Sequence, residues 1–569
     1  MSSNYQRFHT RHDPVRTTTA QGFPAPGPQS AGADRNAASA FFSSDWKQVQ
    51  AADYDFIVIG TGPCGVAFIE RTLAHDPHAR ILMLERGGYW LPLHYQMLPA
   101  AFQATTGSPP ITYPWSRTAA MATGGARLFQ AGAIPVLGGR STYWSGWCPA
   151  PEPEMLRGWP QGLVDVTLKP GFWIDARAFL HVTDADRIDD DVYGCLQRQL
   201  DINLRENVGR LVPSAQGACA APLAVGDSGW QGVKFHKYAT VGTLLGLHQR
   251  QQALAAQGRG AALAIVDRCT VTRLLHDGRG KVLALETGRG PLAADTAKVV
   301  LAMGTIPPAT LLMHSFGDLL PNAGKRYTGH VVSHLTARVK RAAFRDLSAL
   351  ELGAHYVHGR SADGLQYHVQ VSAFASAHPE RDAATIAYEA PDAAAMASPA
   401  QLRGSEDCVL FVCVALGEIG EAAPDNWIRL DPGIDPSTGV RIQLLAGPRE
   451  LALWDVMDEA TCQTVEALAS RHGSRPAIEY WVEQGDAGGV WQAERPSCEQ
   501  VRLPVIVDEA SALWIGPDPA TSVVGLDYRP HGVQNVYVTG GALFPTAGSW
   551  NPTLTMCGLA QDLADRLAR

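Results

Sequence analysis

Three closely spaced glycines and one acidic residue form the first group in this sequence that could bind a ligand. Gly60, Gly62 and Gly65 stand in the segment GTGPCG, and Glu85 ends the next apolar run. In a dinucleotide site the first glycine permits a tight turn, the second lets backbone approach a pyrophosphate, and the third lets a helix pack closely on a strand. The helix N-terminus attracts phosphate, and an acid placed like Glu85 accepts hydrogen bonds from ribose hydroxyls. This pattern favours FAD or NAD over NADP.

Two further glycine-containing stretches favour FAD over NAD. Residues 136–142 (VLGGRST) lie far downstream of the first motif, and residues 538–546 (VTGGALFPT), followed by 551–555 (NPTLT), form the third stretch. One dinucleotide contacted from three distant parts of the chain would be enclosed along its length. Such enclosure suits FAD better than an exchangeable nicotinamide cofactor, so we predict FAD.

The elements around the first glycines predict a βαβ unit. Residues 54–59 (YDFIVI) form an apolar, β-branched run typical of a strand buried in a parallel sheet. Residues 66–74 carry apolar side chains at helical spacing, and residues 80–84 (RILML) form a second apolar run. Strand, glycine turn, helix, strand and acid follow in the order of a right-handed βαβ unit.

Later segments predict the rest of the fold. Apolar runs indicate strands that could return to the same sheet; they are 264–267, 270–275, 282–287, 298–302 and 535–539. From about 342 to 496, alternating strands (367–374, 409–416) and a helix near 450–470 resemble an inserted antiparallel-sheet domain. A last helix is expected from Thr555 onward. The predicted fold class is therefore α/β (α+β overall), with a Rossmann-like FAD-binding domain.

The predicted domain boundaries follow from these elements. The FAD-binding domain is discontinuous and takes 46–150, 235–341 and 500–569. The substrate-binding domain takes 151–234 and 342–499, and a flexible extension takes 1–45. A chain of 569 residues is too long for one compact core, which agrees with two large domains.

Composition and charge narrow the functional class. A formal net charge of −8 gives no electrostatic attraction to a phosphate backbone, so we expect no nucleic acid partner. No apolar run approaches the roughly 20 residues of a membrane-spanning helix. The ten cysteines are scattered without CxxC or zinc-finger spacing, so we expect no metal. Residues 1–39 lack the apolar core of a signal peptide, and the expected location is cytoplasmic.

The three glycine-containing stretches resemble the glucose-methanol-choline (GMC) oxidoreductases, and most of all their pyranose-oxidase-like branch. The resemblance covers about 53–149, 262–334 and 508–569, roughly half of the chain, and is most specific in 542–555 (ALFPTAGSWNPTLT). It implies an FAD-dependent oxidoreductase. Its implied cofactor-binding residues are Gly60, Gly62, Pro63, Cys64, Gly65, Glu85, Arg86, Gly138, Gly139, Arg140, Ser141, Val271, Gly304, Gly541, Ala542, Asn551, Pro552 and Thr553.

The resemblance also implies a catalytic pair, and here the sequence departs from the family. In such enzymes a base, usually His, takes the hydroxyl proton of an alcohol, and a second His or Asn stands beside it. Asn551 matches the second position, although it could instead cap the last helix. The expected His is Asp508, in DEASALWIG where relatives carry HEAGTLWMG. Asp508 could act as the base if burial raised its pKa, or it could be a structural acid in a site that has lost alcohol chemistry. For His330 and His334 we expect a packing or hydrogen-bonding role.

Two functional hypotheses follow. The first is FAD-dependent oxidation of a C–OH or related C–H group of a small organic substrate by hydride transfer to flavin N5, with O2 or another acceptor reoxidising the flavin. The alternative is a redox-neutral or non-redox lyase or isomerase on the same scaffold, favoured by Asp508. Some relatives bind flavin covalently through a His in the second glycine stretch. The corresponding residue here is Tyr143, so we predict non-covalent FAD.

Overall fold

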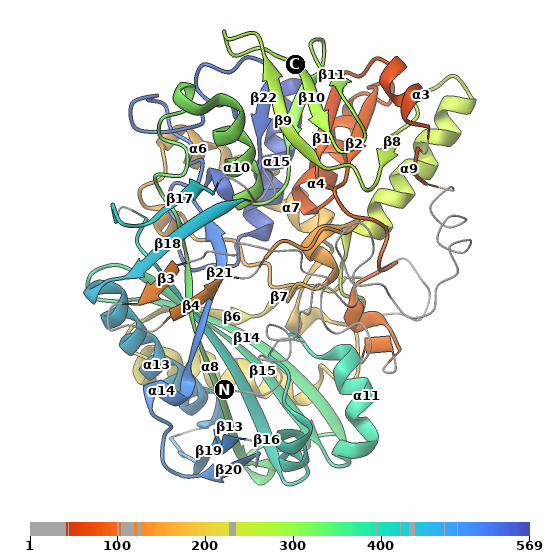
Figure 1. Cartoon of the computed structure of the whole chain (residues 1–569). Helices are drawn as coiled ribbons and strands as arrows, with labels where there is room; N and C mark the ends of the chain where they lie inside the picture. The colour runs from red at the N-terminus through yellow and green to blue at the C-terminus, as the bar shows by residue number, and fades with distance from the viewer. Residues whose placement is uncertain are drawn as a thin grey trace.

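The computed structural model describes residues 41–568 except 44, 100–101, 104–118, 123–126, 131, 227–234, 393–394, 422, 432–438, 472 and 486–487, with backbone only at 119–122 and 127–130. Figure 1 shows a parallel sheet with its helices in the upper part and a large, mainly antiparallel sheet in the lower part. The predicted α/β class is confirmed. Most of the predicted N-terminal extension, 1–45, lies outside the described residues.

A parallel sheet of five described strands forms the upper part. Its order is β22 (Val536–Val538), β12 (Lys298–Leu301), β1 (Phe56–Ile59), β2 (Ile81–Leu84) and β8 (Ala264–Val266). Every residue of β1 and β2 is buried, as expected of a parallel sheet covered on both faces. Helices α4 (Pro63–His75) and α15 (Thr553–Leu567) pack against each other. These elements confirm the Rossmann-like prediction.

Two strands predicted as possible members of this sheet belong elsewhere. Residues 270–275 and 282–287 become β9 (Val271–His276) and β10 (Val282–Thr287), which form a separate antiparallel sheet with β11 (Leu292–Ala293). The reason is the connection between them. A short turn can join antiparallel neighbours, whereas parallel pairing in one sheet needs a crossover of about a dozen residues or more.

The second sheet has 12 strands among the described residues. Its central strands, in spatial order, are β21 (Arg502–Ala510), β13 (Thr328–Lys340), β16 (Cys408–Glu418), β15 (Gln366–Ser376) and β14 (Leu350–Arg360). Helices α8 (Cys195–Leu211) and α13 (Pro448–Ala469) pack on one face. The predicted inserted antiparallel sheet and its helix are thus present.

The opposite face of this sheet carries buried polar side chains. Directly opposed residues of neighbouring strands share a face, and residues two apart on one strand do so as well. His330 on β13 pairs with Glu418 on β16, and His368 and Gln370 on β15 pair with Leu416 and Val414. The register therefore brings these polar residues to one face.

The remaining described elements complete the two parts. The strands are β3 (Ala119–Ala122), β4 (Arg127–Gln130), β5 (Val182–Asp184), β6 (Ala215–Ala220), β7 (Pro222–Ala224), β17 (Trp427–Leu430), β18 (Val440–Ala446), β19 (Ile478–Glu483) and β20 (Gly489–Gln492). The helices are α3 (Trp46–Ala51), α6 (Gln161–Thr167), α7 (Phe172–Phe179), α9 (Thr240–Ala256), α10 (Ile306–Phe316), α11 (Pro379–Glu389), α12 (Pro399–Leu402) and α14 (Cys498–Val501).

The division into domains stays a prediction. Strands of the large sheet come from both predicted domains, because β13 and β21 lie within 235–341 and 500–569.

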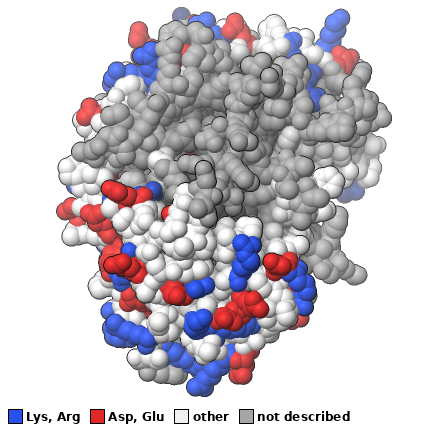
Figure 2. All heavy atoms as spheres, turned by 60° about the horizontal axis from the view of Figure 1, so that its bottom comes forward, with Lys and Arg blue, Asp and Glu red and all other residues white. Residues whose placement is uncertain are grey.

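Figure 2 shows that charges of both signs are interspersed on the described part of the lower face. No described helix is long and apolar enough to cross a membrane.

Candidate functional site

A cavity runs from the turn after β1 to the start of α15, and most of the sequence-predicted residues line it. Its walls also include the ends of β2, β12 and β21, the start of β9 and the segment 133–144. The predicted residues on its surface are Gly60, Gly62, Pro63, Cys64, Glu85, Arg86, Gly139, Arg140, Ser141, Val271, Gly304, Asp508, Pro552 and Thr553. The other predicted residues, Gly65, Gly138, Gly541, Ala542 and Asn551, do not line the cavity.

The glycine turn has the shape that a pyrophosphate site requires. Gly60 has φ +103°, and a Cβ there would lie 2.5 Å from the carbonyl oxygen of Ala302. A Cβ on Gly65 would lie 2.3 Å from the carbonyl oxygen of Gly60, so both glycines permit close backbone packing. A Cβ on Gly62 would meet no atom within 4 Å and lies where the cavity begins. The first turn of α4 has no side-chain cap, which leaves its N–H groups for a phosphate.

Glu85 holds this turn as well as lining the cavity. Its Oε2 accepts hydrogen bonds from Thr61 N (3.2 Å) and Thr61 Oγ1 (2.6 Å), and its Oε1 accepts one from Gly87 N (2.9 Å). Burial raises the pKa of the Glu85 carboxyl, while these hydrogen bonds act in the opposite direction. Each carboxylate oxygen has two acceptor positions, so a ribose hydroxyl can still be bound.

Two threonines absent from our prediction connect the first and second glycine stretches. Gly138 N donates to Thr61 Oγ1 (3.0 Å), and Ser141 Oγ lies 2.9 Å from Thr240 Oγ1. Thr61 and Thr240 are fully buried. Thr61 stands inside the glycine motif, so its position offered a signal, whereas nothing near Thr240 in the sequence indicated this contact.

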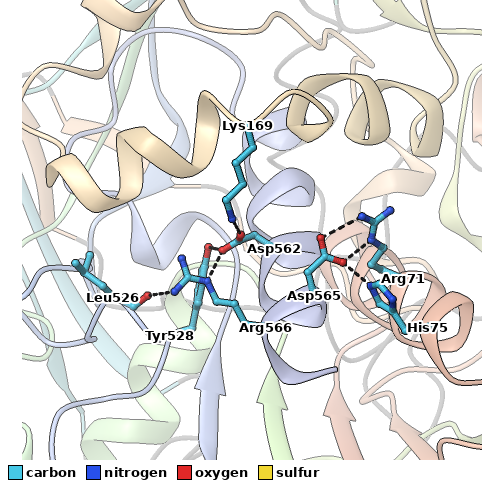
Figure 3. A network of polar contacts seen from close by, with 8 residues as sticks. All are labelled: Arg71, His75, Lys169, Leu526, Tyr528, Asp562, Asp565 and Arg566. Atoms are coloured by element: carbon cyan, nitrogen blue, oxygen red, sulfur yellow. Dashed lines mark hydrogen bonds and ion pairs between the residues drawn. The ribbon is translucent and has the colours of Figure 1, made fainter. Parts of the chain in front are cut away.

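Helix α15 brings its N-terminus to the cavity, where Pro552 and Thr553 lie on the surface. Two carboxylates further along the helix, Asp562 and Asp565, fix it to its surroundings (Figure 3). Asp562 binds Tyr528 (2.9 Å) and Lys169 outside the helix and Arg566 (2.7 Å) within it, and Asp565 binds Arg71 (2.5 Å) and His75 (2.6 Å). Because Arg71 and His75 belong to α4, the two helices that begin at the cavity are fastened together.

Asp508 lies at the cavity surface in an uncommon backbone conformation. Its φ is +54°, a region that Asp and Asn enter more readily than most residues. Its Oδ2 lies 3.2 Å from Nδ1 of His330, a residue of β13 whose side chain is 1% exposed, while the Asp508 side chain is 25% exposed. The structure thus places an imidazole directly behind the Asp508 carboxylate.

The next residue, Glu509, secures the second glycine stretch. Its Oε1 pairs with Arg140 Nη1 at 2.7 Å, and its side chain is buried. The Thr305 hydroxyl donates to the Glu509 backbone carbonyl at 2.6 Å. Glu509 lines the cavity and was absent from our predicted residues, although it directly follows Asp508.

Asn551 is held by the large sheet. Gln370 Nε2 donates to Asn551 Oδ1 at 2.7 Å and lies 3.0 Å from His368 Nε2. With its oxygen occupied in this way, the Asn551 amide presents Nδ2 as its remaining donor. His368 and Gln370, two apart on one strand, were missed, because their approach to Asn551 depends on strand register.

Tyr143 lies beside the second glycine stretch but does not line the cavity. Its hydroxyl accepts a hydrogen bond from Trp90 Nε1 (2.8 Å), and its ring stacks on Tyr95 with a centroid distance of 5.1 Å. Burial raises the pKa of the Tyr143 hydroxyl. A half-buried, neutral phenol with these contacts has a packing role that accounts for its presence.

Two of three comparisons with known proteins found a match. Residues 429–560 match the family model described as GMC oxidoreductase, a range that includes Asp508 and Asn551. Among solved structures the chain is similar to pyridoxine 4-oxidase from Mesorbium loti, with a TM-score of 0.56 and 16% sequence identity over 90% of this chain and 99% of that one. A search of curated proteins finds no match.

Of the three ranges that resemble this family in sequence, the matched range includes only 508–560, whereas the shared fold extends over 90% of the chain. The glycine turn, the helix N-terminus and the cavity that they line fit a dinucleotide such as FAD. Over residues 429–560 the chain is similar to the GMC oxidoreductases, and the fold that it shares with pyridoxine 4-oxidase extends over 90% of the chain.

Proposed function

We propose that this enzyme oxidises a C–OH or related C–H group of a small organic substrate. The observation that carries the proposal is the position of Asp508, which lines the cavity near Pro552 and Thr553 and has an imidazole behind it. Bound FAD would accept the hydride that leaves the substrate carbon. O2 or another small acceptor would then take the electrons. The proposal therefore requires a group that accepts the hydroxyl proton of the substrate.

Asp508 is proposed as that group. A carboxylate within hydrogen-bond reach of a hydroxyl can accept its proton if its surroundings make the protonated state accessible. His330 at 3.2 Å provides a second place for the proton, so Asp508 does not have to work as an isolated weak base. This contact favours oxidation over the redox-neutral alternative, because the imidazole missing from the 508 segment is supplied by β13.

Asn551 is proposed to orient the substrate. Gln370 fixes its amide oxygen, and the Nδ2 group can donate to the substrate oxygen. A fixed donor of this kind raises the rate by holding the carbinol in one orientation. Capping of α15 does not explain Asn551, since the N-cap of that helix is Pro552.

The proposed cofactor residues would divide FAD between them. The turn Gly60–Gly65 and the N-terminus of α4 would hold the pyrophosphate, Glu85 the ribose, and Val271 the adenine. Gly139, Arg140 and Ser141 would lie along the flavin edge. We propose non-covalent FAD, since Tyr143 is engaged with Trp90 and Tyr95. Acid precipitation should release the yellow cofactor into the supernatant; flavin retained by the precipitated polypeptide would contradict this.

The test of the proposed function is anaerobic bleaching. The FAD-loaded enzyme is mixed without oxygen with a panel of primary and secondary alcohols, and flavin absorbance is followed. At least one alcohol should bleach the wild-type flavin, and the Asp508→Asn variant should bleach far more slowly while keeping its FAD. The matched control is Asp518→Asn, a change at an exposed aspartate of the following loop. Turnover of a substrate with no bleaching at any stage would favour the redox-neutral alternative.

A cytoplasmic location stays a prediction.

A further inference from the structure

His330 lies in a fully buried position next to the candidate base. On β13 it is opposite Glu418 of β16 on one side and Val507 of β21 on the other. The neighbouring residue on β21 is Asp508, whose Oδ2 lies 3.2 Å from His330 Nδ1. The ring of His368 meets the ring of His330 edge to face, with centroids 6.4 Å apart.

Both nitrogens of His330 lack a hydrogen bond of good geometry to any described residue. Leaving a buried polar group without a partner costs about 1–3 kcal/mol, so such a group calls for an explanation. In the described part of the chain, the only ion-pair contact of the ring is the one to Asp508. An imidazole that is held against a cavity-lining carboxylate, and otherwise left unbonded, is suited to changing its proton content.

We propose that Asp508 and His330 act as one proton-accepting unit, in which Asp508 takes the hydroxyl proton of the substrate and His330 stores it on Nδ1. The O–H bond of the substrate breaks, the proton passes through the Asp508 carboxylate, and an N–H bond forms on His330. The pair then carries one more positive charge than before. This inference rests on the proposed function, which it deepens by naming where the proton resides.

Of the other titratable groups that face His330, Glu418 ionises in the same pH range. Burial raises the pKa of Glu418 to about 7, so this carboxyl can itself take up a proton between about pH 6 and 8, and the Glu418→Gln variant removes that contribution from the proton count. Burial, with His330 as the next cause, holds the pKa of His368 well below its ordinary value, which keeps that ring neutral. Asp508 on β21, Glu418 on β16 and His368 on β15 are the groups that surround the ring. Of these groups only Asp508 lines the cavity, and it contacts His330, so the Asp508–His330 pair is the one that can receive a proton directly from the substrate.

The test counts protons and needs no substrate. FAD in the purified holoenzyme is reduced anaerobically at an electrode through a redox mediator, in weakly buffered solution containing a pH indicator. The reduced flavin carries a negative charge that stabilises a proton on a neighbouring base, by linkage. We expect the wild type to take up about two protons per flavin between about pH 6 and 8, one for the flavin and one for the pair.

The variants decide whether His330 is the site. His330→Gln and Asp508→Asn should each lower the uptake to about one proton per flavin, because each removes one half of the pair. His334→Gln is the matched control, since His334 lies on the same strand and face and desolvation lowers its pKa to about 4. It should leave the count at the wild-type value.

Two results would overturn the proposal: a wild-type uptake of about one proton at every pH, or an unchanged uptake in His330→Gln. If His330→Gln does not retain FAD, ¹⁵N NMR of the histidine-labelled wild type serves instead. The spectrum must then show one imidazole that becomes doubly protonated when the flavin is reduced. If no imidazole does so, the proposal is overturned. If no alcohol bleached the flavin but the proton count were as expected, the proposed function would be rejected. The proposal that Asp508 and His330 accept a proton together would still hold.

Discussion

The two ends of the cavity are built in different ways. At the glycine turn, positions are fixed by backbone: a Cβ on Gly60 or Gly65 would overlap a carbonyl oxygen. At the other end, Asp508 contacts His330, and Asn551, which precedes the cavity-lining Pro552, is held by Gln370; both partners come from strands far away in sequence. The first end has little tolerance for added atoms. The second end depends on donors and acceptors, so its chemistry can change while the fold persists.

The largest effect is expected from adding a side chain at the turn. Gly60→Val places a β-branched residue at φ +103° and a Cβ 2.5 Å from Ala302 O. Strain and overlap of this kind cost several kcal/mol, about 1–3 kcal/mol from each source. We expect little folded, FAD-containing protein, measured by flavin absorbance and thermal unfolding. Gly62→Val is the comparison, because space around its Cβ is open. The Gly62→Val variant should fold with near wild-type Tm and lose FAD. If both variants were equally destabilised, close backbone packing would not distinguish Gly60 from Gly62.

Asp508→Asn tests the other end and should leave the fold alone. Loss of a general base typically lowers the rate about 10²–10⁴-fold. We expect a reduction of that size in the rate of anaerobic bleaching by the best alcohol, with FAD content and Tm close to wild type. If the variant lost FAD instead, Asp508 would be a residue that holds the cofactor, as the glycine turn is proposed to do.

Gln370→Ala should have a smaller, purely positional effect. It removes the donor that fixes the Asn551 oxygen at 2.7 Å. We expect kcat to fall about 10-fold with little change in FAD affinity, because the amide loses its orientation but stays in place. Gln366→Ala on the same strand is the control: its side chain binds the Met155 carbonyl, so stability should fall while kcat holds. Equal kcat in both variants would argue against orientation by Gln370.

The smallest effect concerns stability and pH. Glu418 has its pKa raised to about 7 in the folded chain from an ordinary value of 4.5. Between these pH values the folded state binds more protons than the unfolded state, so the contribution of Glu418 is present at low pH and lost as pH rises through about 7. The full range is at most about 3 kcal/mol. Glu418→Gln should flatten the fall in unfolding free energy from pH 5 to 8, measured by denaturant titration. An identical slope in both proteins would show that Glu418 ionises normally.

The sequence predicted the backbone-built end well, because its signal is local. Gly60, Gly62, Gly65 and Glu85 lie within one βαβ unit, and the strands and helix around them appear within a few residues of the predicted bounds. The hairpin β9–β10 was assigned to the wrong sheet, since short apolar runs carry no information on their partners.

The side-chain-built end was predicted only in part. Asp508 and Asn551 came from resemblance, and their roles stay predictions. The contact of His330 with Asp508 depends on irregular pairing of β13 with β21, where the register shifts on both sides of residues 330 and 331. The bond from Gln370 to Asn551 spans 181 residues. Neither a bulge nor such a distant contact leaves a pattern in a single sequence.

The order of strands in the parallel sheet has a consequence for folding. β1 pairs with β12, which lies more than two hundred positions along the chain, and β12 pairs with β22, which is as distant again. Contacts this remote make folding slow, because long loops must close before the contacts stabilise anything. Until β12 arrives, the apolar edge of β1 would be open to other chains. We expect refolding yield to depend strongly on protein concentration and on the presence of a chaperone that shields strand edges.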